Sequence, residues 1–85
     1  MSYSVELTRS ATRELRRVPE PYHTSIVRVL RELEKEPRPR GCKKLAGATA
    51  LYRVRVGVYR IIYEVSDRIK LIVVERIADR KEAYK

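Results

Sequence analysis

The stretch from Leu51 to Val65, LYRVRVGVYRIIYEV, decides the fold of this chain. Its side chains alternate with period two on both sides of Gly57, which is the pattern of two half-buried strands joined by a tight turn. Gly57 can adopt the positive φ that a two-residue hairpin turn requires, so we predict the turn at Gly57-Val58. The predicted register has three central pairs: Val56 with Tyr59, Arg55 with Arg60, and Arg53 with Ile62.

The two faces of this hairpin differ in their chemistry. One is predicted to face the core and carries Tyr52, Val54, Val56, Tyr59, Ile61, Tyr63 and Val65. The other, which we call the arginine face, carries Arg53, Arg55 and Arg60. Like charges directly across a ladder destabilise it. The arginine face is therefore either an ordinary solvated surface or a surface that binds an anion.

Length and composition set the class of protein. With 85 residues and 44% hydrophobic content, residues 1–85 are expected to form one globular domain. No apolar run approaches the length of a bilayer span, and the first residues lack the apolar segment of a signal peptide. We therefore expect a cytoplasmic protein with no membrane partner.

The net charge of +9 is unevenly distributed. Residues 1–36 hold seven basic and six acidic side chains, and residues 37–85 hold thirteen basic and five acidic ones, so the two segments carry +1 and +8. The hairpin lies in the basic segment. This concentration favours a nucleic acid or an acidic protein as the partner.

The rest of the chain predicts the order β-α-α-β-β-β. A strand is expected over Tyr3–Leu7, and a helix capped by Thr8 or Ser10 ends before Pro19. A second helix follows Pro21 and ends at Pro37. Residues 37–44, PRPRGCKK, are expected to form a basic loop, and after a turn at residues 66–68 a central strand covers residues 70–77. The fold class is α+β: a mostly antiparallel sheet is covered on its apolar face by a helical hairpin, and the arginine face stays open with residues 78–85 at its rim.

The register of the last strand and the scarcity of cysteine and histidine both bear on which residues can form a site. A loop of two or three residues before the last strand decides whether Glu75 or Arg76 faces the arginine face, and the sequence leaves this open. The single cysteine, Cys42, and the single histidine, His23, make a metal site improbable, and no cofactor is predicted. Lys43 and Lys44 can activate the Cys42 thiol, but a structural role is favoured.

The segments KKLAG, LYRVRVGVYRIIYEV and ERIADRKEAYK together resemble the C-terminal half of the RelE/ParE superfamily of toxins from type II toxin–antitoxin systems, closer to RelE. The likeness is specific over Lys44–Lys85. Over residues 3–36 it consists of the element order and the helical pattern. The resemblance implies a RelE-like fold and a toxin that pairs with an acidic, RelB-like antitoxin in a hetero-oligomer.

The resemblance leaves three functions open. RelE-type members enter the ribosomal A site and cut mRNA, which makes ribosome and mRNA the expected partners. ParE-type members share the fold but inhibit DNA gyrase without nuclease chemistry. A non-catalytic RNA-binding relic of the fold is the third reading. We expect the first, a metal-independent endoribonuclease that inhibits translation.

Matching the family pattern to this chain assigns the residues of the site. The basic strand pair falls on Arg53 and Arg55, the next strand gives Arg60, and the tail gives Arg80 and Tyr84. This chain departs from the pattern in carrying arginine where RelE enzymes often carry lysine at 53 and 55, and in carrying Asp79 where a histidine or another basic residue often precedes the tail arginine.

The chemistry of RNA cleavage suggests a role for each of these residues. The rigid fork of arginine suits the non-bridging oxygens of a phosphate, so Arg60 and Arg80 are expected to hold the scissile group. Arg53 and Arg55, with Lys43 and Lys44, are expected to bind flanking phosphates. Tyr84 is the first candidate for the general base, because nearby guanidinium groups lower a phenol pKa from about 10. Tyr84 could equally stack on a base, and Asp79 or Glu64 could supply a carboxylate instead.

Overall fold

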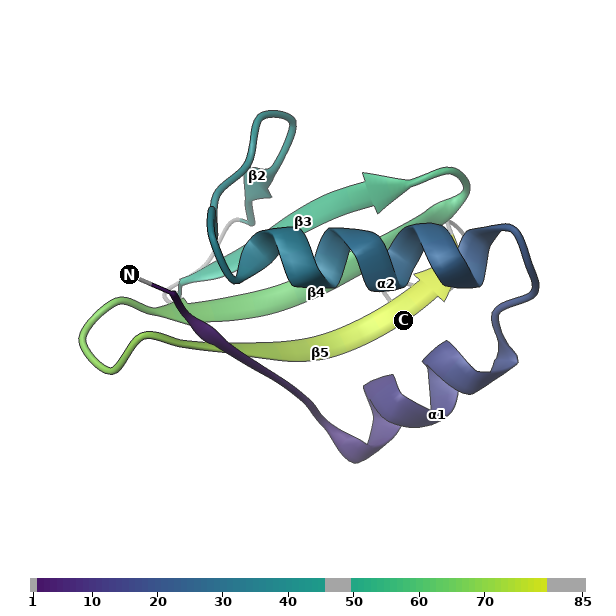
Figure 1. The fold of residues 1–85 in the computed structure, drawn as a ribbon, viewed down its shortest axis with the longest axis horizontal. Helices are drawn as coiled ribbons and strands as arrows, with labels where there is room; N and C mark the ends of the chain where they lie inside the picture. The colour runs from purple at the N-terminus through teal and green to yellow at the C-terminus, as the bar shows by residue number, and fades with distance from the viewer. Residues whose placement is uncertain (1, 46–49, 80–85) are drawn as a thin grey trace.

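A computed structural model describes residues 2–45 and 50–79 and contains one sheet and two helices (Figure 1). The elements are β1 (Ser4–Leu7), α1 (Arg9–Arg17), α2 (Tyr22–Leu33), β2 (Lys43–Lys44), β3 (Leu51–Val56), β4 (Tyr59–Ser66) and β5 (Leu71–Asp79). The strand order is β1-β5-β4-β3-β2, in which β1 is parallel to β5 and the other neighbours are antiparallel. The predicted α+β class, with a mostly antiparallel sheet and two helices, is confirmed.

The hairpin has the predicted register. Val56 pairs with Tyr59, Arg55 with Arg60 and Arg53 with Ile62. Gly57 has a φ of +60°, in the left-handed region that the turn requires. A Cβ atom at this position would lie 2.6 Å from the Cε1 atom of Tyr22 on α2. Gly57 therefore serves both the turn and the close approach of the helix.

The core lies between the two helices and the predicted apolar face of the sheet. Ala11 and Val18 from the α1 segment and Ile26, Leu30 and Leu33 from α2 are buried against that face. Figure 1 shows α2 running across the sheet and α1 lying beside β5. The largest fully buried side chain is Tyr63, whose pKa is raised by burial. Its hydroxyl donates to the carbonyl of Pro37 at 2.8 Å and so ties β4 to the loop after α2.

Both helices begin near their predicted starts, but the second one ends early. Of the two predicted caps for α1, Thr8 is the one used, and its hydroxyl accepts the Ala11 N–H at 3.0 Å. α2 ends at Leu33 rather than at Pro37. The carbonyl of Glu34 accepts a hydrogen bond from the N–H of Tyr3 at 2.8 Å. The chain therefore pairs with the residue before β1 directly after the helix ends.

Two strands differ from the prediction. Residues 37–44 were expected to be a loop, but Lys43 and Lys44 form the short strand β2 on the free side of β3. β5 begins at Leu71 after a turn over residues 67–70 and extends to Asp79. An irregularity between Ile62 and Tyr63 shifts the pairing of β4 with β5 and leaves Glu75 as the extra residue.

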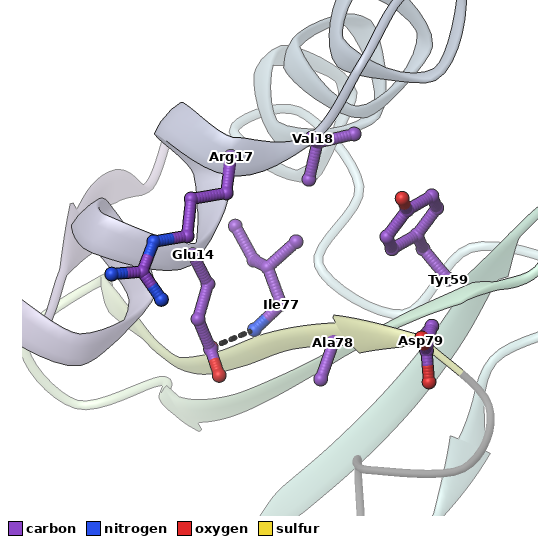
Figure 2. Close-up of a pocket in the computed structure, with 7 residues that line it drawn as sticks. All are labelled: Glu14, Arg17, Val18, Tyr59, Ile77, Ala78 and Asp79. Carbon is purple, nitrogen blue, oxygen red and sulfur yellow. Dashed lines mark hydrogen bonds between the residues drawn. The ribbon is translucent and has the colours of Figure 1, made fainter.

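Among residues 2–45 and 50–79, the far half of β5 has no strand neighbour on its β1 side, because β1 pairs only with Leu71–Val74. The side chain of Glu14 on α1 occupies this edge instead. Its Oε1 accepts a hydrogen bond from the Ile77 N–H at 2.7 Å (Figure 2). Its Oε2 accepts a hydrogen bond from the Nε–H of Arg76 at 2.9 Å. A carboxylate on α1 thus holds the end of the central strand.

Among the described residues, neither helix is long and apolar enough to span a bilayer.

Candidate nucleic-acid interface

The arginine face is organised in rows across the strands. Arg55 of β3 and Arg60 of β4 are direct partners, and Ala78 of β5 continues their row. Together with Gly57 and Val58 these two arginines line a depression of about 150 Å³ at the tip of the hairpin. Two guanidinium groups on the rim of one depression make an anion the natural ligand of this part of the face.

The neighbouring row joins four strands. It runs from Lys43 through Arg53 and Ile62 to Arg76. Lys43 therefore shares the arginine face, whereas Lys44 is the partner of Tyr52 and belongs to the opposite face. The question that the sequence left open is also answered, because Arg76 rather than Glu75 lies in the row of Arg53. Its guanidinium group reaches Glu14 on α1.

The middle of this face is apolar and less open than predicted. Ile62 and Ala78 are buried there, and Leu45 and Leu51 pack against them. Arg53 and Arg60 are half-buried, and Arg55 is exposed. The face thus has a small apolar centre with cationic side chains around it, which is a surface able to hold a phosphate group beside an uncharged ring or sugar.

The two candidate carboxylates differ in their positions. Glu64 lies four residues from Arg60 along β4, about 13 Å away at the rise of a strand. It pairs with Leu51 and Val73 at the other end of the sheet. The structure therefore does not bring Glu64 to the Arg55–Arg60 pair. Asp79 is at the hairpin end, but its register partner is Tyr59, which places Asp79 on the opposite face of the sheet from the arginine face.

The predicted tail residues Arg80 and Tyr84 lie outside the described residues. The last described residue, Asp79, lines a second depression of about 200 Å³ between α1 and the end of β5 (Figure 2). Its other lining residues are Glu14, Arg17, Val18, Tyr59, Ile77 and Ala78. The sequence analysis did not predict that Glu14 accepts hydrogen bonds from β5. The signal was its position as the one acidic residue in a helix with four arginines.

Two further observations concern metal ions and the cysteine. In the part of the chain that the structure describes, no three His, Cys, Asp or Glu side chains gather closely enough to hold a metal ion. Cys42 is half-buried and packs against the core cluster, consistent with the structural role that the sequence favoured.

The fold and the arginine face define a small α+β protein whose sheet carries a cationic surface. A model of the family described as the ParE toxin of type II toxin–antitoxin systems, parDE, matches residues 5–84. The chain belongs to this family and is thus a toxin of the RelE/ParE superfamily.

Individual relatives are named for RelE and RelG. The chain is 32% identical to the solved structure of the archaeal RelE–RelB complex from Pyrococcus horikoshii OT3, with a TM-score of 0.85 and coverage of 98% of this chain and 100% of that one. It is 27% identical to the RelB–RelE antitoxin–toxin complex of Methanococcus jannaschii, with a TM-score of 0.77 and coverage of 93% and 94%. It is also 27% identical to toxin RelG of Mycobacterium tuberculosis over 100% of this chain and 99% of that protein. Within the superfamily the chain is therefore close to RelE.

Proposed function

We propose that this toxin is a ribosome-dependent endoribonuclease that cleaves mRNA in the ribosomal A site and so stops translation. The observation that carries the proposal is the facing pair Arg55 and Arg60 at the hairpin tip, which line one depression. The pair is costly for the hairpin, because like charges across a ladder repel each other. A phosphate bound between the two guanidinium groups would reduce this repulsion.

The proposed reaction is a transfer of the phosphoryl group within the RNA. The 2′-oxygen attacks the adjacent phosphorus, the bond from phosphorus to the 5′-oxygen breaks, and the products are a 2′,3′-cyclic phosphate and a 5′-hydroxyl. One proton leaves the 2′-OH and one reaches the 5′-oxygen. Arg60 would stabilise the charge that develops on the non-bridging oxygens, with Arg80 as its proposed second contact.

The remaining residues complete the assignment. Arg53, Arg55 and Lys43 share the face of Arg60 and are suited to flanking phosphates, and Lys44 could only contribute from the edge strand. Tyr84 is the proposed general base, since arginine stays protonated with a pKa above about 12. Action on ribosomes implies a cytoplasmic location.

The proposed partner besides ribosome and mRNA is an acidic, RelB-like antitoxin. Supporting this, the RelE structures from Pyrococcus horikoshii and Methanococcus jannaschii are complexes with RelB. A net charge of +9 favours rapid association with an acidic chain, while tight binding requires buried apolar contacts. Co-expression with the adjacent open reading frame should rescue growth and give a hetero-oligomer that survives moderate salt. Failure to bind, or complete dissociation at moderate salt, would count against the pairing.

The test of the proposed activity is induction of the protein in growing cells, followed by mapping of mRNA ends and of plasmid supercoiling. We expect cuts within translated codons, and we expect Arg60→Ala to lower cleavage by about 10²–10³, the effect of removing one preorganised charge stabiliser. Arg28→Ala, which removes an exposed arginine from α2, is the matched control and should cleave normally.

A second function has its own support, because the matching family model is described by ParE. A ParE-like toxin would inhibit DNA gyrase and needs the cationic face but no base. In the same experiment it would give double-strand DNA breaks and altered supercoiling with intact mRNA. A non-catalytic RNA-binding relic would give neither effect.

A further inference from the structure

α1 carries a second cationic surface on the opposite side from its buried stripe. At about 100° per residue, its four arginines fall within a sector of roughly 100°, and Ala11, Leu15 and Val18 fall on the far side of the helix. The four are Arg9, Arg13, Arg16 and Arg17, and all of them are exposed. Arg9, Arg13 and Arg16 form a row about 10 Å long at the rise of an α-helix.

The charges of this row are not compensated locally. The one acidic residue of α1 is Glu14, which is held by the Ile77 N–H and the Arg76 guanidinium group. Within residues 2–45 and 50–79, none of the four arginines forms an ion pair. On α2 the charges alternate instead, because Arg28 and Arg31 stand beside the exposed Glu32 and Glu34. The balance of +1 over residues 1–36 therefore conceals a separation in space, with the cations gathered on α1.

The composition of the α1 surface favours a phosphate backbone over an acidic protein segment. A protein partner needs buried apolar anchors for affinity. The apolar residues of α1 are already committed, since Ala11 and Val18 are buried and Leu15 packs against the core. What remains exposed on this side is guanidinium. Backbone phosphates are bound by such groups without any apolar contact.

We propose that the arginine row of α1, Arg9, Arg13 and Arg16, docks the sugar–phosphate backbone of a structured RNA. The row is separate from the arginine face. The docking proposal rests on the proposed function only because that function makes RNA the ligand. Figure 2 shows Arg17 at the C-terminal end of α1, near the end of β5. A duplex held along α1 would therefore be anchored beside the end of the sheet where the Arg55–Arg60 pair lies, and it would position the molecule without reading sequence.

The test compares two variants of equal net charge in the full chain. The first is Arg9→Gln/Arg13→Gln/Arg16→Gln on α1. The matched control is Arg28→Gln/Arg31→Gln/Lys35→Gln, which removes three exposed cations from α2 and the residues after it. The affinity of each for a fluorescently labelled RNA duplex is measured by anisotropy as salt is varied. Exposed substitutions of this kind usually change stability by less than about 0.5 kcal/mol, and circular dichroism checks the fold.

Each phosphate contact contributes about 0.7–0.9 to the slope of log K against log salt, so the α1 variant should lose about 2–3 from that slope and at least about tenfold in affinity. The α2 control should keep most of both. Equal losses in the two variants would show that binding follows net charge alone and would overturn the proposal. So would an α1 variant that binds the duplex like the wild type but loses affinity for poly-L-glutamate, since the partner would then be an acidic protein.

The outcome is independent of catalysis. If the wild type leaves mRNA intact in cells while the duplex affinity is lost only in the α1 variant, the proposed nuclease function fails and the docking surface stands. If mRNA is cut and the two variants bind the duplex alike, the proposed nuclease function stands and the docking surface on α1 fails.

Discussion

Arg38 shows how one residue can join three distant segments of this chain. Its Nη1 and Nη2 atoms donate to the carboxylate of Asp67 at 3.1 and 2.7 Å, and its Nε donates to the hydroxyl of Tyr52 at 2.9 Å. Tyr3, just before β1, also donates to Asp67, at 2.5 Å. The loop after α2, the turn before β5 and the start of the chain thus meet at one carboxylate. The hydrogen bonds from Arg38, with that from Tyr3, lower the pKa of Asp67 to about 2.

This cluster predicts a pH dependence of stability. Because the pKa of Asp67 is lower in the folded state than in the unfolded chain, its contribution is present above the unfolded pKa of about 4 and is lost as the pH falls through about 2. We expect Asp67→Asn to be less stable than wild type at pH 7, with the difference shrinking from about pH 4 downward. Urea unfolding at several pH values measures it. Glu32→Gln, which removes an exposed carboxylate from α2, should not reproduce this pattern.

The Arg55–Arg60 pair predicts a conflict between stability and function at a single residue. Replacing the exposed Arg55 by threonine removes a like-charge repulsion across the ladder and should stabilise the fold by about 0.2–1 kcal/mol. The same variant should bind RNA more weakly. Thermal unfolding at low and high salt identifies the cause, because a gain that comes from charge fades as salt screens it. A gain that persists unchanged at high salt would instead reflect the strand propensity of threonine.

At the scale of elements, the end of β5 depends on a helix rather than on a strand. Glu14 accepts the Ile77 N–H where β1 has already ended. Glu14→Ala removes this acceptor and should cost about 1–3 kcal/mol, the range for a buried group left unsatisfied. Amide hydrogen exchange should accelerate at Ile77 while amides of β3 and β4 change only through global stability. Glu14→Gln retains an oxygen acceptor and should lose less, and equal losses in both variants would point to the charge pair with Arg76 instead.

The hairpin tip is coupled to α2 through Gly57 and Tyr22. Gly57→Ala places a methyl group in contact with the Tyr22 ring at a positive φ. Left-handed strain costs about 1–2 kcal/mol for a residue other than glycine, and overpacking adds about 1–3 kcal/mol. The Tyr22→Ala background removes the contact but not the strain, so a double-mutant cycle should give a coupling above about 1 kcal/mol. A coupling near zero would assign the whole cost to backbone strain.

The accuracy of the sequence prediction follows how local each element is. The β3–β4 register depends on Gly57 and on alternation within fifteen residues, and it was predicted in full. The shift between Ile62 and Tyr63 depends on how β5 fits against β4, and nothing near Glu75 in the sequence signals it. β2 is two residues long and exists only because β3 offers a free edge, so it was predicted as loop.

The same reasoning applies to the site. Arg53, Arg55 and Arg60 could be assigned to one face from alternation alone, and the structure groups them there. The separation of Lys43 from Lys44 depends on the register of β2, which no local pattern specifies. The hydrogen bonds of Glu14 reach Arg76 and Ile77, which lie 62 and 63 positions further along the sequence. No argument from periodicity predicts contacts over such a separation.

At the scale of the whole molecule, described cations cluster on the arginine face of the sheet and on the outer side of α1, while Glu32, Glu34 and Glu36 gather at the end of α2 and directly after it. The charge is thus unevenly distributed over the surface, and such clusters of one sign steer the association of the molecule with an RNA surface. The orientation of the RNA by its surroundings also affects catalysis.

The final prediction is that the isolated protein cleaves free RNA poorly and mRNA on ribosomes well. The single histidine, His23, lies on α2 and not on the arginine face, so the chain has no histidine pair to serve as a self-sufficient acid and base. In-line attack then depends on an external template that holds the 2′-oxygen near the phosphorus, and well-oriented intramolecular reactions gain effective molarities of about 10⁵–10⁸ M. We expect kcat/KM on mRNA in programmed ribosomes to exceed that on the same free mRNA by at least about 10³, both measured with purified toxin. A chelator should leave the ribosome-free rate unchanged. Efficient cleavage of free RNA, within about tenfold of the ribosomal rate, would mean that the site is complete in itself and that the ribosome supplies only the location.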